Sequence, residues 1–196
     1  MKRPARTAVE AAVRTLIAHA GDDPARPGLA ETPSRVVDAF TTAFSGYGRD
    51  PRAALGAPLP AGRAAGQLVV LRDLPFLSYC EHHLAPFFGT ATVAFEAAEL
   101  LVGIGHLADL VTVLARRLQL QERLTEEIAD VLARVLAPRG IAVLLDATHT
   151  CLHLHHPRAG PGRLRTLHLS GSLRERAASF PALFGGDAGA AQSGSV

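Results

Sequence analysis

The sequence has almost no lysine, little cysteine and no long apolar run. Lys2 is its only lysine, so arginine supplies the remaining basic charge, and 20 basic side chains nearly balance 18 acidic ones. This balance excludes a charged tail for binding nucleic acid or another polyanion. Only two cysteines are present, which excludes a disulfide framework and favours a reducing, cytoplasmic setting. No apolar run approaches the roughly 20 residues that cross a bilayer, so we expect no membrane partner.

The N-terminal third is predicted to be helical. Apolar residues recur at helical spacing over residues 4–20, which predicts a first helix. A threonine followed by proline is a typical helix start, and it predicts a second helix over residues 32–45. Residues 50–66 are rich in alanine, proline and glycine and are predicted to form a loop. We therefore expect a helical N-terminal region over residues 1–66.

The remainder is predicted to contain four strands and two helices. Apolar and β-branched stretches predict strands over residues 67–74, 87–96, 141–147 and 163–170, and apolar helical faces predict helices over residues 105–117 and 122–136. In this order, consecutive strands can pair as antiparallel hairpins with helices on one face, which is an α+β fold. We expect this domain to occupy residues 67–184, and the small, polar residues 185–196 to be a disordered tail.

Two cysteines and a histidine form a candidate zinc site. Cys80 and His83 are three residues apart and can reach one ion, and Cys151 is the only other cysteine. Two thiolates and an imidazole suit zinc, and three protein ligands leave a fourth position for water, as in catalytic sites. His82 and His149 lie beside these ligands in the sequence and are candidates to move protons. The alternative is that both cysteines are small buried residues without a metal.

Four motifs resemble those of the GTP cyclohydrolase I family. They are Glu31-Thr32-Pro33-Ser34-Arg35, Cys80-Glu81-His82-His83-Leu84-Ala85-Pro86-Phe87, Arg117-Leu118-Gln119-Leu120-Gln121-Glu122-Arg123-Leu124-Thr125 and His149-Thr150-Cys151. They occur in the family's order and at its separations. The resemblance implies the tunnelling fold (T-fold), whose subunits assemble into a β-barrel ring. It also implies a homo-oligomer, commonly a decamer, with active sites shared between subunits.

The resemblance also implies a reaction. Family members hydrolyse the imidazole ring of a guanine nucleotide at C8, release formate and rearrange the ribose to give a dihydropterin. It makes Cys80, His83 and Cys151 the ligands of Zn²⁺ and His82 and His149 the catalytic proton-transfer groups. These roles suit the chemistry, because C8 of a purine is a weak electrophile that needs an activated water and a proton donor.

Substrate contacts are implied for three further residues. Gln121 and Glu122 match the family's guanine-binding pair, with the Glu122 carboxylate reading the N–H edge of the base. Arg35 matches one of the basic residues that hold the triphosphate. Judged by the helix dipole alone, Glu122 would instead be an exposed carboxylate at the start of a helix.

Other triphosphate-binding positions depart from the family pattern. A family lysine is replaced by Asp38, a Ser-Lys-x-x-Arg pattern by Gly105, His106 and Asp109, and an arginine by His155. Carboxylates repel a polyanion, and histidines that are mostly neutral near pH 7 would not restore the charge. We therefore predict that the substrate is a guanine-type purine or related heterocycle that lacks the triphosphate.

Two alternatives stay open. The chain could be an ordinary GTP cyclohydrolase I that makes dihydroneopterin triphosphate and formate from GTP. It could also be a non-catalytic, ring-forming paralogue with a binding or regulatory role. In the latter case its zinc would be structural, and a fourth protein ligand such as His153 or His155 is expected.

Overall fold

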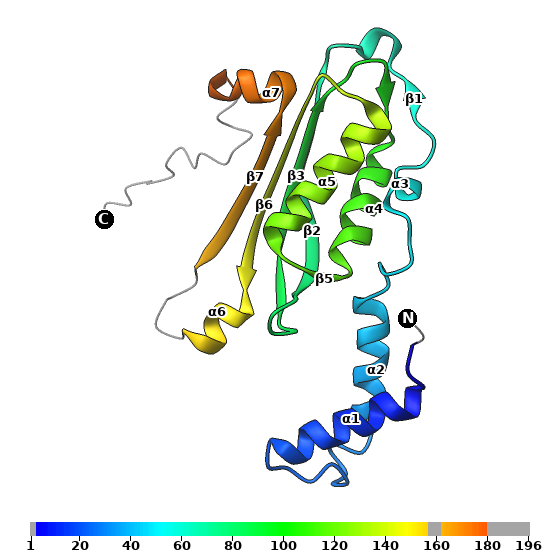
Figure 1. Ribbon diagram of the computed structural model, residues 1–196, viewed down its shortest axis with the longest axis vertical. Helices are drawn as coiled ribbons and strands as arrows, with labels where there is room; N and C mark the ends of the chain where they lie inside the picture. The colour runs from blue at the N-terminus through cyan, green and yellow to red at the C-terminus, as the bar shows by residue number, and fades with distance from the viewer. Residues whose placement is uncertain (1–2, 157–161, 180–196) are drawn as a thin grey trace, which may run out of the picture.

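The fold is centred on one curled antiparallel sheet with helices on one face (Figure 1). The structure is a computed structural model that describes residues 3–156 and 162–179. The strands are β1 (Leu59–Pro60), β2 (Leu68–Cys80), β3 (Pro86–Glu96), β4 (Leu100–Leu101), β5 (Leu118–Gln119), β6 (Gly140–His149) and β7 (Arg163–Ser170). The helices are α1 (Arg6–His19), α2 (Thr32–Ala43), α3 (Pro51–Ala54), α4 (Ile104–Ala115), α5 (Gln121–Leu136), α6 (Thr150–His155) and α7 (Gly171–Glu175), with short 3₁₀ turns at Gly62–Ala64 and Ala177–Ser179.

The main sheet has five strands in the order β5-β2-β3-β6-β7. The four long strands pair antiparallel, and only the short β5 runs parallel to β2. Helices α4 and α5 lie side by side across one face of this sheet (Figure 1). The predicted α+β fold, with its order of two helices, two strands, two helices and two strands, is therefore confirmed.

The core lies between this face of the sheet and the two helices. In α5 the buried side chains of Leu124, Ile128 and Leu132 recur every four residues, which gives the helix one apolar stripe. They pack with Phe87 and Phe95 of β3, which are fully buried. Burial of this face fixes the register of the strands, because a slip by one residue would turn these side chains to the opposite face.

Strand β2 extends beyond its predicted end at residue 74 and reaches Cys80. Asp73 and Pro75, which stand at this point of the chain, are residue types that disfavour regular strands. The structure accommodates both, because the pairing with β3 shifts register between Leu71 and Leu74, and Asp73 has φ 58°. The proline is tolerated because β2 is bordered on its other side only at Tyr79 and Cys80. Cys80 thus ends the strand and begins the tight turn that leads to β3.

The N-terminal helices are confirmed, and the loop is more ordered than predicted. Helices α1 and α2 pack against each other and extend away from the sheet (Figure 1). The predicted loop at 50–66 contains α3, β1 and a 3₁₀ turn, and β1 pairs with β4 beside the sheet. The predicted tail at 185–196 lies outside the described residues. Among those described, no helix combines the length and apolar character needed to cross a bilayer.

Candidate active site

Three strand ends bring the candidate zinc ligands together. Cys80 is the last residue of β2, His83 lies in the turn before β3, and Cys151 is in the first turn of α6, directly after β6. Because β3 pairs with both β2 and β6, the start of β3 holds the ends of both neighbours at one edge. The ligand atoms of the three residues all lie within 4.8 Å of one another.

The turn between β2 and β3 is tightly closed. The Leu84 N–H donates to the Cys80 carbonyl at 2.9 Å, and the Cys80 N–H donates to the Ala85 carbonyl at 2.8 Å. Leu84 adopts the left-handed region with φ 54°, which turns the chain back into β3. This geometry places Cys80 Sγ 3.7 Å from His83 Nδ1.

The donor set fits zinc. In a tetrahedral site with the usual Zn–S and Zn–N bond lengths, a sulfur and a nitrogen ligand lie about 3.6 Å apart, close to the observed separation. Burial raises the pKa of the Cys151 thiol, and the neighbouring Cys80 raises it further. A divalent cation between the two sulfurs favours both thiolates and offsets this cost.

His153 and His155 do not join the group of three ligands. The only group of metal-ligating side chains in the described part of the chain is Cys80, His83 and Cys151. His155 nevertheless lies close by, with its ring centroid 4.7 Å from that of His83. A zinc ion held by the three ligands would therefore keep one coordination position free of these histidines.

His149 is held by a stacked ring and by a buried amide. Its imidazole stacks on Phe87 with ring centroids 4.5 Å apart, and its Nε2 lies 2.8 Å from Gln121 Oε1. The orientation of that amide is fixed, because Gln121 Nε2 donates to the carbonyls of Leu145 and Leu164 at 3.1 and 2.9 Å. Since an amide oxygen only accepts, neutral His149 carries its proton on Nε2 and leaves Nδ1 able to accept one.

Burial of His149 favours its neutral form. Burial lowers the pKa of His149, and the nearby Glu122 carboxylate opposes this effect only in part. Glu122 is exposed in the first turn of α5, one residue after Gln121. His82 is exposed in the turn, with its ring centroid 6.1 Å from that of His83. The structure thus brings together the predicted zinc ligands, one candidate base and the start of α5.

An open pocket of about 510 Å³ adjoins these side chains. Its walls are His83, His149, Cys151, Leu152, His155, His156, Gly162, Arg163 and Leu164. This volume is in the range of pockets that bind small molecules. Of the altered triphosphate positions, His155 is the one that lines it.

The other predicted triphosphate positions lie elsewhere in the chain. Arg35 and Asp38 are exposed on α2, and the Asp38 carboxylate pairs with Arg6 at 2.6 Å rather than with Arg35. Helix α4 rises roughly 1.5 Å per residue, so its residues His106 and Asp109 lie roughly 10–15 Å from the end that leads into β5. Their side chains face each other at 3.7 Å, and Gly105 precedes them in the same exposed turn.

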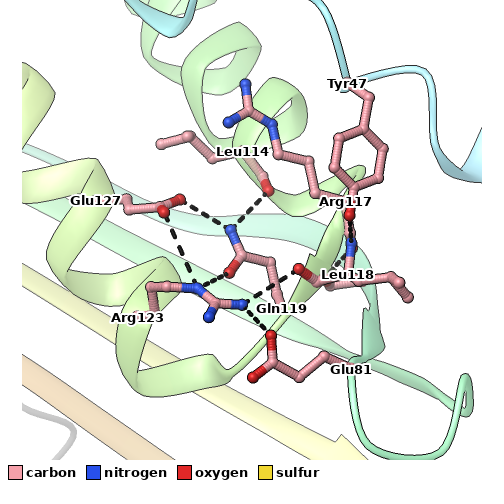
Figure 2. Close-up of polar contacts among 9 residues, drawn as sticks. Tyr47, Glu81, Leu114, Arg117, Leu118, Gln119, Arg123 and Glu127 are labelled. Atoms are coloured by element: carbon pink, nitrogen blue, oxygen red, sulfur yellow. Dashed lines mark hydrogen bonds and ion pairs between the residues drawn. The ribbon is translucent and has the colours of Figure 1, made fainter. Parts of the chain in front are cut away.

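Sequence reasoning missed a polar network beside the zinc turn. Figure 2 shows Arg123 of α5 donating to the carboxylate of Glu81, which stands between Cys80 and His82. Glu81 and Arg123 both belong to motifs identified above, and this membership was the sign of their importance that the sequence offered. Their pairing across 42 positions depends on the packing of β5 beside β2, which no local pattern reports.

Comparison with known proteins places the chain in a family. A model of the family "GTP cyclohydrolase I" matches residues 9–184. The chain is 44% identical over 173 residues to the GTP cyclohydrolase 1 of Leifsonia xyli subsp. xyli, covering 88% of this chain and 91% of that protein. It is 47% identical over 158 residues to that of Maricaulis maris, covering 79% and 77%, and 40% identical over 176 residues to that of Brucella canis, covering 90% and 83%.

The chain therefore belongs to the GTP cyclohydrolase I family. Its sheet, with helices on one face, is the T-fold of that family. A solved structure, the archaeosine synthase QueF-Like in its apo form, covers 53% of this chain and 93% of that chain, with a TM-score of 0.43 and 16% identity. That likeness is too distant to carry an argument.

Proposed function

We propose that this chain is a zinc-dependent cyclohydrolase that opens the imidazole ring of GTP at C8 and yields formate and dihydroneopterin triphosphate. The observation that carries the proposal is that Cys80, His83 and Cys151 lie together, and that two of them, His83 and Cys151, line one pocket with His149. Relatives named GTP cyclohydrolase 1, at 40–47% identity, support GTP as the substrate.

Zn²⁺ would be held by Cys80, His83 and Cys151. When bound, it supplies the Lewis acidity that makes water nucleophilic near neutral pH. The pocket wall made by His83, Cys151 and His149 would direct the purine so that C8 faces the metal side. The free coordination position left by a three-ligand set supports a catalytic role over a structural one, and so disfavours the non-catalytic alternative.

His149 would move a proton at Nδ1. The bond to Gln121 holds Nε2 protonated, and the stacking on Phe87 fixes the ring plane, so Nδ1 has one direction in which to accept. His82, exposed beside the ligand turn, would exchange a second proton with solvent. Two histidines with different burial suit a reaction that needs a base and an acid at the same pH.

Glu122 would bind the guanine N–H edge. Its carboxylate is exposed, and it lies close enough to His149 to affect the pKa of that imidazole. Gln121 is predicted to bind guanine as well, but its side-chain amide already contacts His149, Leu145, Leu164 and Thr166. We therefore assign the Gln121 side chain to holding His149, and leave to its backbone any contact with the base.

A purine without the triphosphate is a second candidate substrate. The observation that favours it is the loss of basic side chains at Asp38, His106, Asp109 and His155. The pairing of Asp38 with Arg6 weakens this argument, because the carboxylate already has a cationic partner. The relatives' names favour GTP, so this candidate ranks second.

GTP would need a neighbouring subunit to contact its triphosphate through these predicted positions. Helix α2 and the first turn of α4 do not line the pocket of their own chain, so they could act on a bound nucleotide only from another copy. We accordingly propose a ring-shaped homo-oligomer, a decamer, with sites shared between subunits. A monomeric mass in solution at micromolar concentration would contradict this assembly.

The decisive experiment incubates the zinc-loaded protein with GTP, GMP, guanosine and guanine. The readouts are loss of purine absorbance, release of formate and the fluorescent oxidised pterin. Conversion of GTP with a micromolar Michaelis constant supports the first candidate, and preferential conversion of guanosine or guanine supports the second. Zinc binding without conversion of any of the four would reject both in favour of the non-catalytic alternative.

A further inference from the structure

The turn between β2 and β3, which carries Cys80 and His83, is hydrogen-bonded through Glu81 to β5 and the start of α5. The Glu81 N–H donates to the Gln119 carbonyl at 3.1 Å, and its carboxylate accepts from the Arg123 guanidinium (Figure 2). Glu81 is the residue between Cys80 and His82. Both bonds therefore act on the backbone segment that carries a metal ligand on one side and a candidate proton carrier on the other.

Arg123 is itself held at several points. Its Nε donates to Gln119 Oε1 at 2.9 Å and its Nη2 donates to the Leu118 carbonyl at 3.3 Å. Gln119 is 2% exposed, and its Nε2 donates to Glu127 at 2.9 Å and to the carbonyl of Leu114 at 3.2 Å. The guanidinium that meets Glu81 is thus fixed by a buried amide (Figure 2). A planar fork of donors is suited to such a role, whereas the single ammonium of lysine is not.

The first turn of α5 also contacts the part of the site that contains His149. Gln121, two residues before Arg123, bonds His149 and the carbonyls of β6 and β7. The start of α5 therefore contacts the β2–β3 turn through Arg123 and the end of β6 through Gln121. These two attachments add to the pairing of β3 with β2 and β6, which already holds Cys80 and His83 near Cys151.

We propose that Arg123 is a positioning residue: by holding Glu81 it fixes Cys80 and His82 in the orientation needed for zinc binding and proton transfer. This inference rests on the proposed function for its catalytic part, and on zinc binding alone for its structural part. Side chains that orient metal ligands typically change metal affinity or activity by about 10–100-fold when replaced. If Arg123 only held α5 against β5, its replacement would lower the melting temperature and leave the zinc affinity unchanged.

The test compares Arg123→Met and Arg123→Lys with Arg134→Met, a control on the exposed end of the same helix whose partner is Asp130 at 3.4 Å. Zinc affinity of the metal-free proteins is measured by competition with a chromophoric chelator, and their melting temperature is measured in EDTA. We expect Arg123→Met to lose about 10–100-fold in zinc affinity, Arg123→Lys to lose less, and Arg134→Met to match the unaltered protein. In turnover, kcat should fall more than KM changes.

Glu81→Gln provides an independent route if Arg123→Met does not fold. It should weaken zinc binding in the same sense, and the double change Glu81→Gln/Arg123→Lys should cost less than the sum of the two, because the residues act as a pair. Unchanged zinc affinity in Arg123→Lys and Glu81→Gln would overturn the inference, as would additive effects or an unaltered protein that binds no zinc. Unaltered protein that binds zinc but converts no purine would refute the proposed function and leave the zinc-affinity test of Arg123 standing.

Discussion

The end of the sheet that carries the predicted zinc ligands (the zinc end) and the predicted triphosphate positions on α2 and α4 differ in how completely a single chain assembles them. At the zinc end, the ends of β2 and β6, the turn before β3 and the start of α5 converge, and hydrogen bonds connect each to another. The triphosphate positions on α2 and α4 are exposed and pair with residues of their own surroundings. The proposed ring-opening chemistry therefore uses residues that one chain brings together, whereas the proposed phosphate contacts lie on surfaces that would face a neighbour in the proposed ring.

This difference predicts that the two regions differ in their tolerance to substitution. Exposed side chains such as Asp38 and Asp109 can be exchanged at little cost in stability. Replacing Gln121 would leave the carbonyls of Leu145 and Leu164 without their donor in a buried setting. Substrate preference can therefore change on α2 and α4 without disturbing the metal centre.

The largest effect is expected for removal of a zinc ligand. Cys151→Ala should reduce zinc from one ion per chain to near zero and reduce cyclohydrolase activity by more than the roughly 100-fold typical of residues that only support a ligand. Metal analysis of the purified protein and formate release measure the two effects. The matched control is His153→Ala on the same short helix, which should keep its zinc. Zinc loss in that control would instead indicate a fourth protein ligand.

The next effect concerns phosphate binding, and it tests directly whether the altered positions contact the triphosphate. If basic residues at these positions hold the triphosphate, replacing Asp38 and His106 by Lys and Asp109 and His155 by Arg should strengthen GTP binding. Charge-assisted hydrogen bonds contribute roughly 1.5–3 kcal/mol each, so three restored at the low end give on the order of a thousandfold. The measurement is the ratio of kcat/KM for GTP and guanosine at two salt concentrations. An unaltered protein that already binds GTP at micromolar concentration would show that other cations fill this role.

The sequence predicted the zinc end better than its surroundings, for physical reasons. Cys80, His83 and Cys151 stand in motifs that resemble those of a known family, and the long amphipathic α5 has a clear helical period. Strand β2 was predicted to end at residue 74 but continues to Cys80, past Asp73 and Pro75, which disfavour regular strands. Their accommodation depends on a bulge and an edge position that only the paired sheet reveals.

Long-range side-chain pairs could not be predicted from the sequence, for a related reason. The bond of Arg123 to Glu81 and that of Arg6 to Asp38 join residues 42 and 32 positions apart. Asp38 pairs with Arg6 and not with Arg35, one turn away on the same helix, because α1 packs on α2 and brings Arg6 close. Local spacing cannot decide between partners when a second helix supplies one.

A smaller effect is expected at Glu122. Glu122→Gln should lower kcat/KM for GTP by roughly 10–150-fold, which corresponds to the roughly 1.5–3 kcal/mol of a hydrogen bond to a charged group. Zinc content should stay at one per chain, because Glu122 is not among the metal-ligating group. Steady-state kinetics with GTP provide the measurement, and Glu126→Gln, exposed one turn later on α5, is the control. Equal kinetics in both variants would make Glu122 an ordinary helix-start carboxylate.

The smallest expected effect is on the free energy of unfolding, and it concerns β6, the strand that leads to Cys151. Asp146 lies on β6, three residues before His149, and its largely buried carboxylate accepts from Arg163 and Arg165 of β7 at 2.6 Å each. Because both arginines are about half exposed, we expect Asp146→Asn to lower the free energy of unfolding by only about 1–2 kcal/mol. Asp130→Asn, at an exposed ion pair on α5, should change it by less than about 0.5 kcal/mol.

The effect of Asp146→Asn should depend on pH in a defined direction. Burial raises the pKa of Asp146, but hydrogen bonds from Arg163 and Arg165 outweigh it, so the folded-state pKa lies below the ordinary value. The carboxylate therefore contributes its full stability above the unfolded-state pKa of about 3.9 and loses it as the pH falls through the lower folded-state pKa. Urea unfolding at pH 7 should separate the variant from the unaltered protein, and the separation should shrink as the pH falls below about 4. A difference that is constant over this range would mean that Asp146 acts by shape and not by charge.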